Sequence, residues 1–193
     1  YIGSRDDALT ARGQRQAEQL AAALALLPVA AVYTSPLRRT RETAQPLANK
    51  LGLPVMVADA LREQAFGDWE GMTRAEVLSA SVASADLLRV WETDAMIAPP
   101  GGESVAAMTE RVSSFVTTLC EHYPAQTVVL VSHVGPIKVL ITATLQVAPG
   151  TARQMFLDPA TISVVDWSNM ERILRLFNSH AHLGWTAARW MQQ

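Results

Sequence analysis

A cluster of arginines follows a short apolar segment near the start of the chain. Residues 35–43 read Ser-Pro-Leu-Arg-Arg-Thr-Arg-Glu-Thr, so a proline turn leads into arginines where a helix is expected to begin. The free N–H groups and the dipole of a helix N-terminus favour an anion, and a guanidinium group adds a planar fork for two phosphate oxygens. Alternatively, Arg38, Arg39 and Arg41 form a solvated charged face that pairs with Glu42. Spacing alone leaves both interpretations open.

A second segment, 61–71, combines carboxylates, aromatic residues and two glycines in the order Leu-Arg-Glu-Gln-Ala-Phe-Gly-Asp-Trp-Glu-Gly. This composition suits an ordered, irregular loop over a site. A carboxyl group held beside apolar side chains can stay protonated near neutral pH and act as a general acid. The alternative is an ordinary surface loop that Phe66 and Trp69 anchor.

One histidine stands at the end of an uninterrupted apolar run. Residues 127–131 predict a strand buried on both faces of a parallel sheet, and His133 follows just before an expected helix. That position is the crevice where open α/β sheets bind ligands, so His133 is a candidate site residue. The other histidines have no such context, and the His-x-His pair lacks a third ligand at a telling spacing: His122, His180 and His182. We therefore expect no metal site.

The elements that must position these residues alternate along the chain. Helices are expected at about 10–27, 37–51, 104–123 and 136–145, and strands at 29–33, 54–57, 127–131, 162–167 and 173–177. Thr10 is the expected N-cap of the first helix and Gly52 the left-handed cap of the second. Residues 61–100 mix loop and helix. The alternation predicts an α/β fold, a three-layer α/β/α sandwich.

The predicted sheet is short by one strand. In such sheets a central strand normally precedes the first helix, yet the first helix here begins within about a dozen residues of Tyr1. We expect this N-terminal central strand to be absent from the chain. Tyr1 is not a start methionine, so the chain is expected to be a fragment, a processed form or an incomplete record.

Composition narrows the class of protein. The 193 residues carry 49% hydrophobic and 18% charged residues with a formal net charge of −2, and they contain no repeat or linker tract, so one domain over residues 1–193 is expected. This balance favours neither a nucleic-acid nor a membrane partner. Cys120 is the only cysteine; it excludes an intrachain disulfide, fits a cytoplasmic location, and is expected to be buried and inert.

Five segments, in order, resemble motifs of the histidine phosphatase superfamily, the phosphoglycerate mutase-like proteins. They are Ala-Leu-Thr-Ala-Arg-Gly-Gln-Arg-Gln-Ala at 8–17, the segments 35–43 and 61–71, Pro-Gly-Gly-Glu-Ser at 100–104, and Ser-His-Val-Gly at 132–135. Segments 136–138 and 158–163 are similar to actinobacterial acid-phosphatase and α-ribazole-phosphatase-like members. The resemblance covers roughly residues 1 to 180.

The resemblance implies a phosphomonoester hydrolase that works through a phosphohistidine and needs no metal or organic cofactor. Arg39 would grip the phosphate, and His133, with Val134 beside it, would bind the phosphoryl group. Glu63 would protonate the leaving alkoxide and then deprotonate the attacking water. The partner would be a small phosphorylated substrate, whose selectivity we expect to depend on residues 72–97.

The family's nucleophile lies in an Arg-His-Gly sequence, which these 193 residues do not contain. It is expected upstream of Tyr1, in the strand that the sheet lacks. Two alternatives follow: phosphoryl transfer of the phosphoglycerate mutase type, and a non-catalytic phosphate-binding or interaction domain if Tyr1 is the true N-terminus. The Glu63 loop favours an enzyme, since a binder needs no acid. A homodimer is left open, and Trp185 and Trp190 are expected to pack on the domain or on a partner.

Overall fold

A three-stranded parallel sheet forms the centre of the molecule. The computed structural model describes residues 1–168 and 171–184, so Trp185 and Trp190 lie outside the described residues. The strands are β1 (Val29–Thr34), β2 (Val55–Val57) and β3 (Thr127–Val131), in the order β2-β1-β3. β1 pairs with both neighbours, which makes it the central strand of this sheet.

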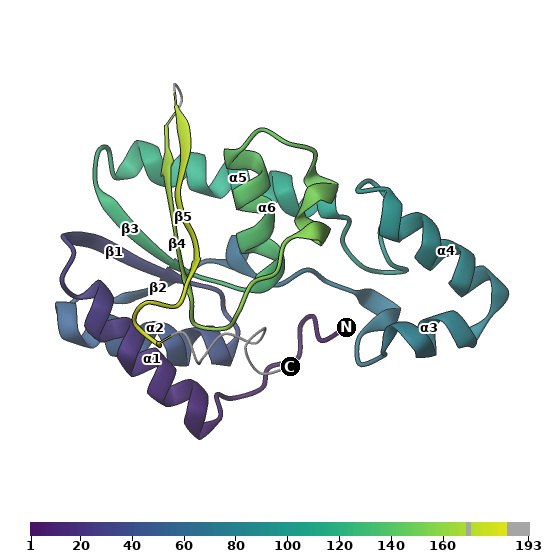
Figure 1. Cartoon of the computed structure of the whole chain (residues 1–193), viewed down its shortest axis with the longest axis horizontal. Coiled ribbons are helices and arrows are strands. Elements are labelled where there is room, and N and C mark those ends of the chain that lie inside the picture. The colour runs from purple at the N-terminus through teal and green to yellow at the C-terminus, as the bar shows by residue number, and fades with distance from the viewer. Residues whose placement is uncertain (169–170, 185–193) are drawn as a thin grey trace.

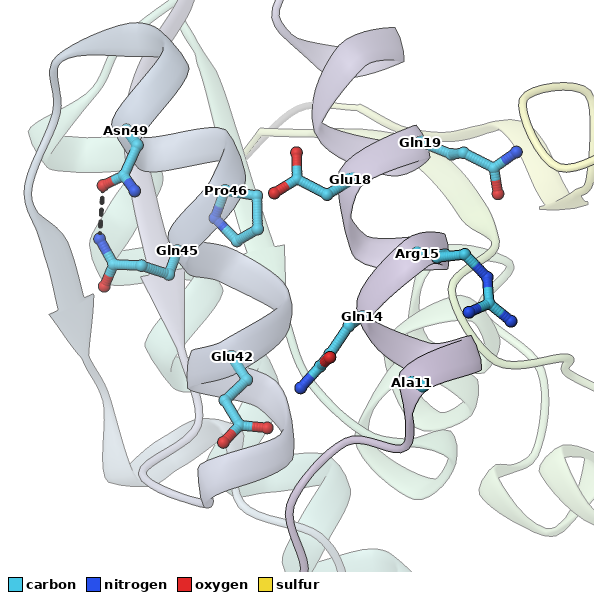
Figure 2. A pocket seen from close by; sticks show the side chains of 9 residues that line it. All are labelled: Ala11, Gln14, Arg15, Glu18, Gln19, Glu42, Gln45, Pro46 and Asn49. Atoms are coloured by element: carbon cyan, nitrogen blue, oxygen red, sulfur yellow. Dashed lines mark hydrogen bonds between the residues drawn. The ribbon is translucent and has the colours of Figure 1, made fainter.

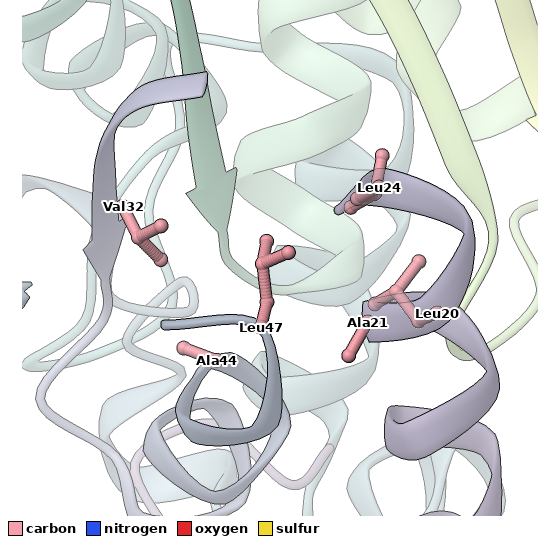
Figure 3. Close-up of a cluster of buried hydrophobic side chains, with 6 residues drawn as sticks. All are labelled: Leu20, Ala21, Leu24, Val32, Ala44 and Leu47. Atoms are coloured by element: carbon pink, nitrogen blue, oxygen red, sulfur yellow. The ribbon is translucent and has the colours of Figure 1, made fainter. Parts of the chain in front are cut away.

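Two pairs of helices enclose the sheet, as the alternation of elements predicts. Helices α1 (Ala11–Leu24) and α2 (Arg38–Leu51) lie on one side of it, and α5 (Val105–His122) and α6 (Val134–Thr144) on the other (Figure 1). The first pair buries a cluster against β1 (Figure 3), made of Leu20, Ala21, Leu24, Val32, Ala44 and Leu47. The second pair buries another: Val105, Met108, Val112, Val139 and Ala152. The three layers of the sandwich are confirmed.

Local signals fix where these helices begin and end. The Thr10 hydroxyl accepts a hydrogen bond from the Gly13 N–H at 3.2 Å, and the Ser104 hydroxyl accepts one from the Ala107 N–H at 3.1 Å. Each satisfies an N–H group that the helix itself cannot pair. Gly52 ends α2 with φ = 66°, a left-handed conformation that glycine adopts at little cost.

The middle of the chain forms a helical arm beside the sandwich. Helices α3 (Arg74–Ala80) and α4 (Val82–Thr93) extend to one side of the layers (Figure 1). Short 3₁₀ turns η1 (Asp59–Leu61) and η2 (Gly67–Trp69) precede them, and a third, η3 (Pro149–Gln154), follows α6. The arm packs on the 61–71 loop through Trp69, Val77, Leu88 and Trp91. The expected mixture of loop and helix is confirmed.

The last strands form a sheet of their own. β4 (Ile162–Trp167) and β5 (Arg172–Ser179) pair antiparallel, as predicted, and β5 is longer than the expected 173–177. Within residues 1–168 and 171–184, β3 pairs only with β1, so the parallel sheet and the hairpin stay separate. The additional N-terminal central strand, which we expect to be absent from the chain, stays a prediction.

Three expectations need correction. β3 is not buried on both faces: Thr127 is exposed and the other residues are half-buried, because β3 has a neighbour on one edge only in the described part. Helix α6 begins at Val134, two residues before Pro136, which the first turn of a helix tolerates. Cys120 is half-buried, and its thiol donates to the carbonyl of Trp167 at 3.0 Å.

No helix among the described residues is long and apolar enough to cross a membrane.

Candidate active site

The carboxyl ends of β1 and β3 place Ser35 and His133 side by side. The two strands are parallel neighbours, so their ends reach the same edge of the sheet. Nε2 of His133 lies 2.8 Å from the hydroxyl of Ser35, and the Ser35 N–H donates to the carbonyl of Val131 at 3.0 Å. His133 is only 7% exposed. A buried imidazole therefore faces the turn that opens α2.

The Glu63 carboxylate reaches the same edge from the 61–71 loop. It accepts hydrogen bonds from the N–H groups of Gln64 at 2.9 Å and of Gly135 at 3.1 Å. Gly135 is in the first turn of α6, two residues after His133. A side chain at position 135 would collide with the carboxylate, because its Cβ would lie 2.3 Å from Oε1 of Glu63. Glycine thus permits the close approach of the acid to the helix.

The structure separates the three candidate arginines. Arg38 is exposed and pairs with Glu42 at 2.6 Å, and Arg41 is exposed as well, so the solvated-face interpretation holds for these two. Arg39 is half-buried and donates to the carbonyl of Gly3 at 3.2 Å and to that of Arg5. Its guanidinium group is therefore held by the N-terminal segment.

Burial sets the protonation of the two titratable groups. Desolvation raises the pKa of the Glu63 carboxyl, and the hydrogen bonds from Gln64 and Gly135 and the charges of Arg39 and Arg111 only partly offset it. Desolvation, with the charges of the same two arginines, lowers the pKa of His133 to about 3. At neutral pH the imidazole of His133 is uncharged. The Glu63 carboxyl is protonated more readily than an exposed carboxyl.

Val134, the other predicted binding residue, is the first residue of α6. Its side chain is 43% exposed, so the residue contributes no packing comparable with that of its buried neighbours. The N–H groups of a helix's first turn have no partner within the helix. Val134 can thus offer an anion its backbone N–H.

Sequence reasoning missed several partners of these residues. Arg111 and Glu103 form a half-buried ion pair next to the 61–71 loop. The Ser132 hydroxyl donates to the carbonyl of Leu61 at 2.7 Å. Elsewhere, buried His180 lies 2.9 Å from Asp158. These contacts join residues that no local motif connects. In the described ranges, no group of three or more His, Cys, Asp or Glu residues could hold a metal ion.

A surface groove between α1 and α2 lies apart from the predicted site residues (Figure 2). Most of the residues that line it have polar side chains, and none of them is a predicted site residue: Ala11, Gln14, Arg15, Glu18, Gln19, Glu42, Gln45, Pro46 and Asn49. The candidate site residues therefore lie at the edge of the sheet and not in this groove.

The family model of the histidine phosphatase superfamily (branch 1) matches residues 1–180. The chain belongs to this superfamily. This confirms the resemblance seen in the motifs.

A bifunctional protein of Mycobacterium tuberculosis is 37% identical over 185 residues, which cover 95% of this chain and 50% of that protein. The chain thus spans about half the length of this relative. Phosphoserine phosphatase 1 of Hydrogenobacter thermophilus is 33% identical, covering 95% of this chain and 86% of that protein. The α-ribazole phosphatase of Shigella flexneri superposes with a TM-score of 0.82 and 28% identity, over 94% of this chain and 89% of that one.

Proposed function

We propose that the protein hydrolyses small phosphomonoesters through a phosphohistidine. The observation that carries this proposal is that a buried, uncharged imidazole, that of His133, and a half-buried carboxyl, that of Glu63, reach the same edge of the sheet. Family membership and relatives named as phosphatases support the reaction class.

In the proposed first step a histidine nitrogen attacks phosphorus, and the bond from phosphorus to the alkoxide oxygen breaks. Glu63 gives its proton to the departing alkoxide, and its raised pKa favours the acid form that this requires. In the second step Glu63 takes a proton from water while the water oxygen bonds to phosphorus and the P–N bond breaks. Phosphate and the free histidine result.

His133, Val134 and Arg39 would bind the phosphoryl group during both steps. An uncharged imidazole can donate one N–H to a phosphoryl oxygen, and preorganised donors of this kind stabilise developing negative charge. Arg39 would supply a full positive charge near the start of α2. The nucleophilic histidine of this mechanism would come from a segment outside these 193 residues, in an Arg-His-Gly sequence.

Glu63→Gln tests the acid role in the full product of the gene. An alkoxide needs a proton in order to leave and p-nitrophenolate hardly does. We therefore expect turnover of glycerol 2-phosphate to fall by about 100-fold, and turnover of p-nitrophenyl phosphate to fall far less. Steady-state kcat values for both esters give the comparison.

Asp68→Asn is the matched control, since it removes an exposed carboxylate from the same loop. It should leave both rates unchanged. Equal losses for the two esters in Glu63→Gln would refute the acid role. If the wild-type protein turns over no ester but still binds inorganic phosphate, the non-catalytic alternative is favoured.

A further inference from the structure

A half-buried ion pair holds the loop that carries Glu63. Nε and Nη2 of Arg111, on α5, donate to the two carboxylate oxygens of Glu103 at 2.8 and 2.7 Å. The side chains are only 19% and 20% exposed. Such a two-point contact fixes the direction of the guanidinium plane, which a single contact does not.

Arg111 and Glu103 also form hydrogen bonds with the chain on both sides of Glu63. On the N-terminal side, Nη1 of Arg111 donates to the carbonyls of Ala60 at 2.6 Å and Arg62 at 3.2 Å. On the C-terminal side, the Gln64 side chain donates to the carbonyl of Glu103 at 2.8 Å, and the Glu103 N–H donates to the carbonyl of Ala65, also at 2.8 Å.

Backbone packing supports the same arrangement. Gly67 and Gly102 lie where the loop crosses the 99–103 turn, and a Cβ at either would come within 2.6 Å of backbone atoms. Gln64 is buried, so the residue next to Glu63 cannot shift freely. The loop is therefore fixed against the start of α5 at residues 60, 62, 64 and 65, and Glu63 alone is directed at α6.

We propose that Arg111 and Glu103 are positioning residues that hold the Glu63 carboxylate against the Gly135 N–H, and thereby set its geometry as the proton donor of the proposed reaction. The proposal rests on the proposed function for its catalytic consequence. Its geometric part stands on the contacts alone. Two measurements therefore test the geometric role and the catalytic consequence separately.

Arg111→Lys is the informative change, because it keeps the positive charge and loses the planar fork. The first readout is hydrogen exchange of the Gly135 amide in the ¹⁵N-labelled chain. That N–H is bonded to Glu63, so releasing the carboxylate should speed its exchange by about tenfold, approaching the rate in Glu63→Ala. The Gly13 amide, which Thr10 caps in distant α1, is the internal reference and should not change.

The second readout is kinetic and uses the full product of the gene. In Arg111→Lys we expect kcat for glycerol 2-phosphate to fall by about tenfold with KM unchanged, while p-nitrophenyl phosphate is nearly unaffected. In the Glu63→Gln background the same change should add no further discrimination between the two esters. Arg175→Lys is the control, since Arg175 on the exposed hairpin uses the same two nitrogens, Nε and Nη2, to bind a carboxylate oxygen of Asp166.

Wild-type exchange at Gly135 in Arg111→Lys overturns the proposal, as does a uniform rise across the β1 and β3 amides, which would report general loss of stability. Faster exchange at Gly135 without any phosphatase activity in the wild type keeps the positioning role and refutes the proposed function. Faster exchange at Gly135 together with equal losses of kcat for the two esters refutes the catalytic part of the proposal.

Discussion

His133 shows how burial changes the chemistry of a single residue. Its pKa lies near 3 in the folded chain, against about 6.5 in an unfolded one. Below pH 6.5 the unfolded chain therefore binds a proton that the native protein does not. Stability should fall as the pH falls, by up to about 2 kcal/mol between pH 7 and pH 5.

Urea unfolding of the wild type and of His133→Gln at both pH values measures this contribution. The variant should lose less stability on acidification, because glutamine does not titrate. Glu63 acts in the opposite sense, since its raised pKa adds stability at low pH that is lost as the pH rises through that pKa. Both proteins retain Glu63, so the difference between them cancels its contribution. Identical pH dependence in the two proteins would contradict burial as the cause of the His133 shift.

Gly135 permits a contact that any other residue would block. In Gly135→Ala the new Cβ would lie 2.3 Å from Oε1 of Glu63 and 3.1 Å from the sulfur of Met108. We expect a loss of about 1–3 kcal/mol in the free energy of unfolding, as in other overpacked sites, together with displacement of the carboxylate.

The consequence for activity should follow the leaving group, with glycerol 2-phosphate affected more than p-nitrophenyl phosphate. Gly150→Ala is the control, because its Cβ would meet only the end of the Arg153 side chain at 3.9 Å. Wild-type stability and activity in Gly135→Ala would show that Glu63 does not depend on this approach.

At the scale of elements, aromatic side chains connect the helical arm to the loop of Glu63. The Trp91 ring of α4 makes edge contacts with Trp69 at 5.5 Å and Phe66 at 6.2 Å, and Arg153 lies over it at 4.7 Å. Helix α4 and the loop of Glu63 are thus packed against each other through these rings. That residues 72–97 set the substrate selectivity stays a prediction.

Trp91→Ala should cost about 3–5 kcal/mol in the free energy of unfolding, because it empties the centre of a buried cluster. Val90→Ala on the same helix removes a side chain that is 47% exposed and should cost under about 0.5 kcal/mol. Urea unfolding followed by circular dichroism compares them. Similar losses in the two variants would show that α4 is not docked through its tryptophan.

At the scale of the whole molecule, the described strands divide into a parallel sheet and a separate hairpin. The helices cover the faces of the parallel sheet, yet β3 presents one unpaired edge within the described residues. An unpaired edge of apolar residues is a template for another strand.

The sequence by itself determined the helices of the sandwich, the strands and two of the caps, because each depends on neighbours a few residues away. Thr10 caps α1 through the N–H three residues on, and Gly52 ends α2 through its own backbone freedom. The position of His133 at a strand end also follows from local pattern, because the end of a core strand faces the ligand crevice in folds of this class.

Only the tertiary structure decided which residues meet. Glu63 and Gly135 are 72 residues apart, and Arg111 and Ala60 are 51 apart. Hydrophobic periodicity assigns a residue to a face, but the packing of whole elements sets where a charged group on that face finally points. That is why three neighbouring arginines that spacing alone did not distinguish separate into Arg39, held by the N-terminal segment, and the exposed pair Arg38 and Arg41.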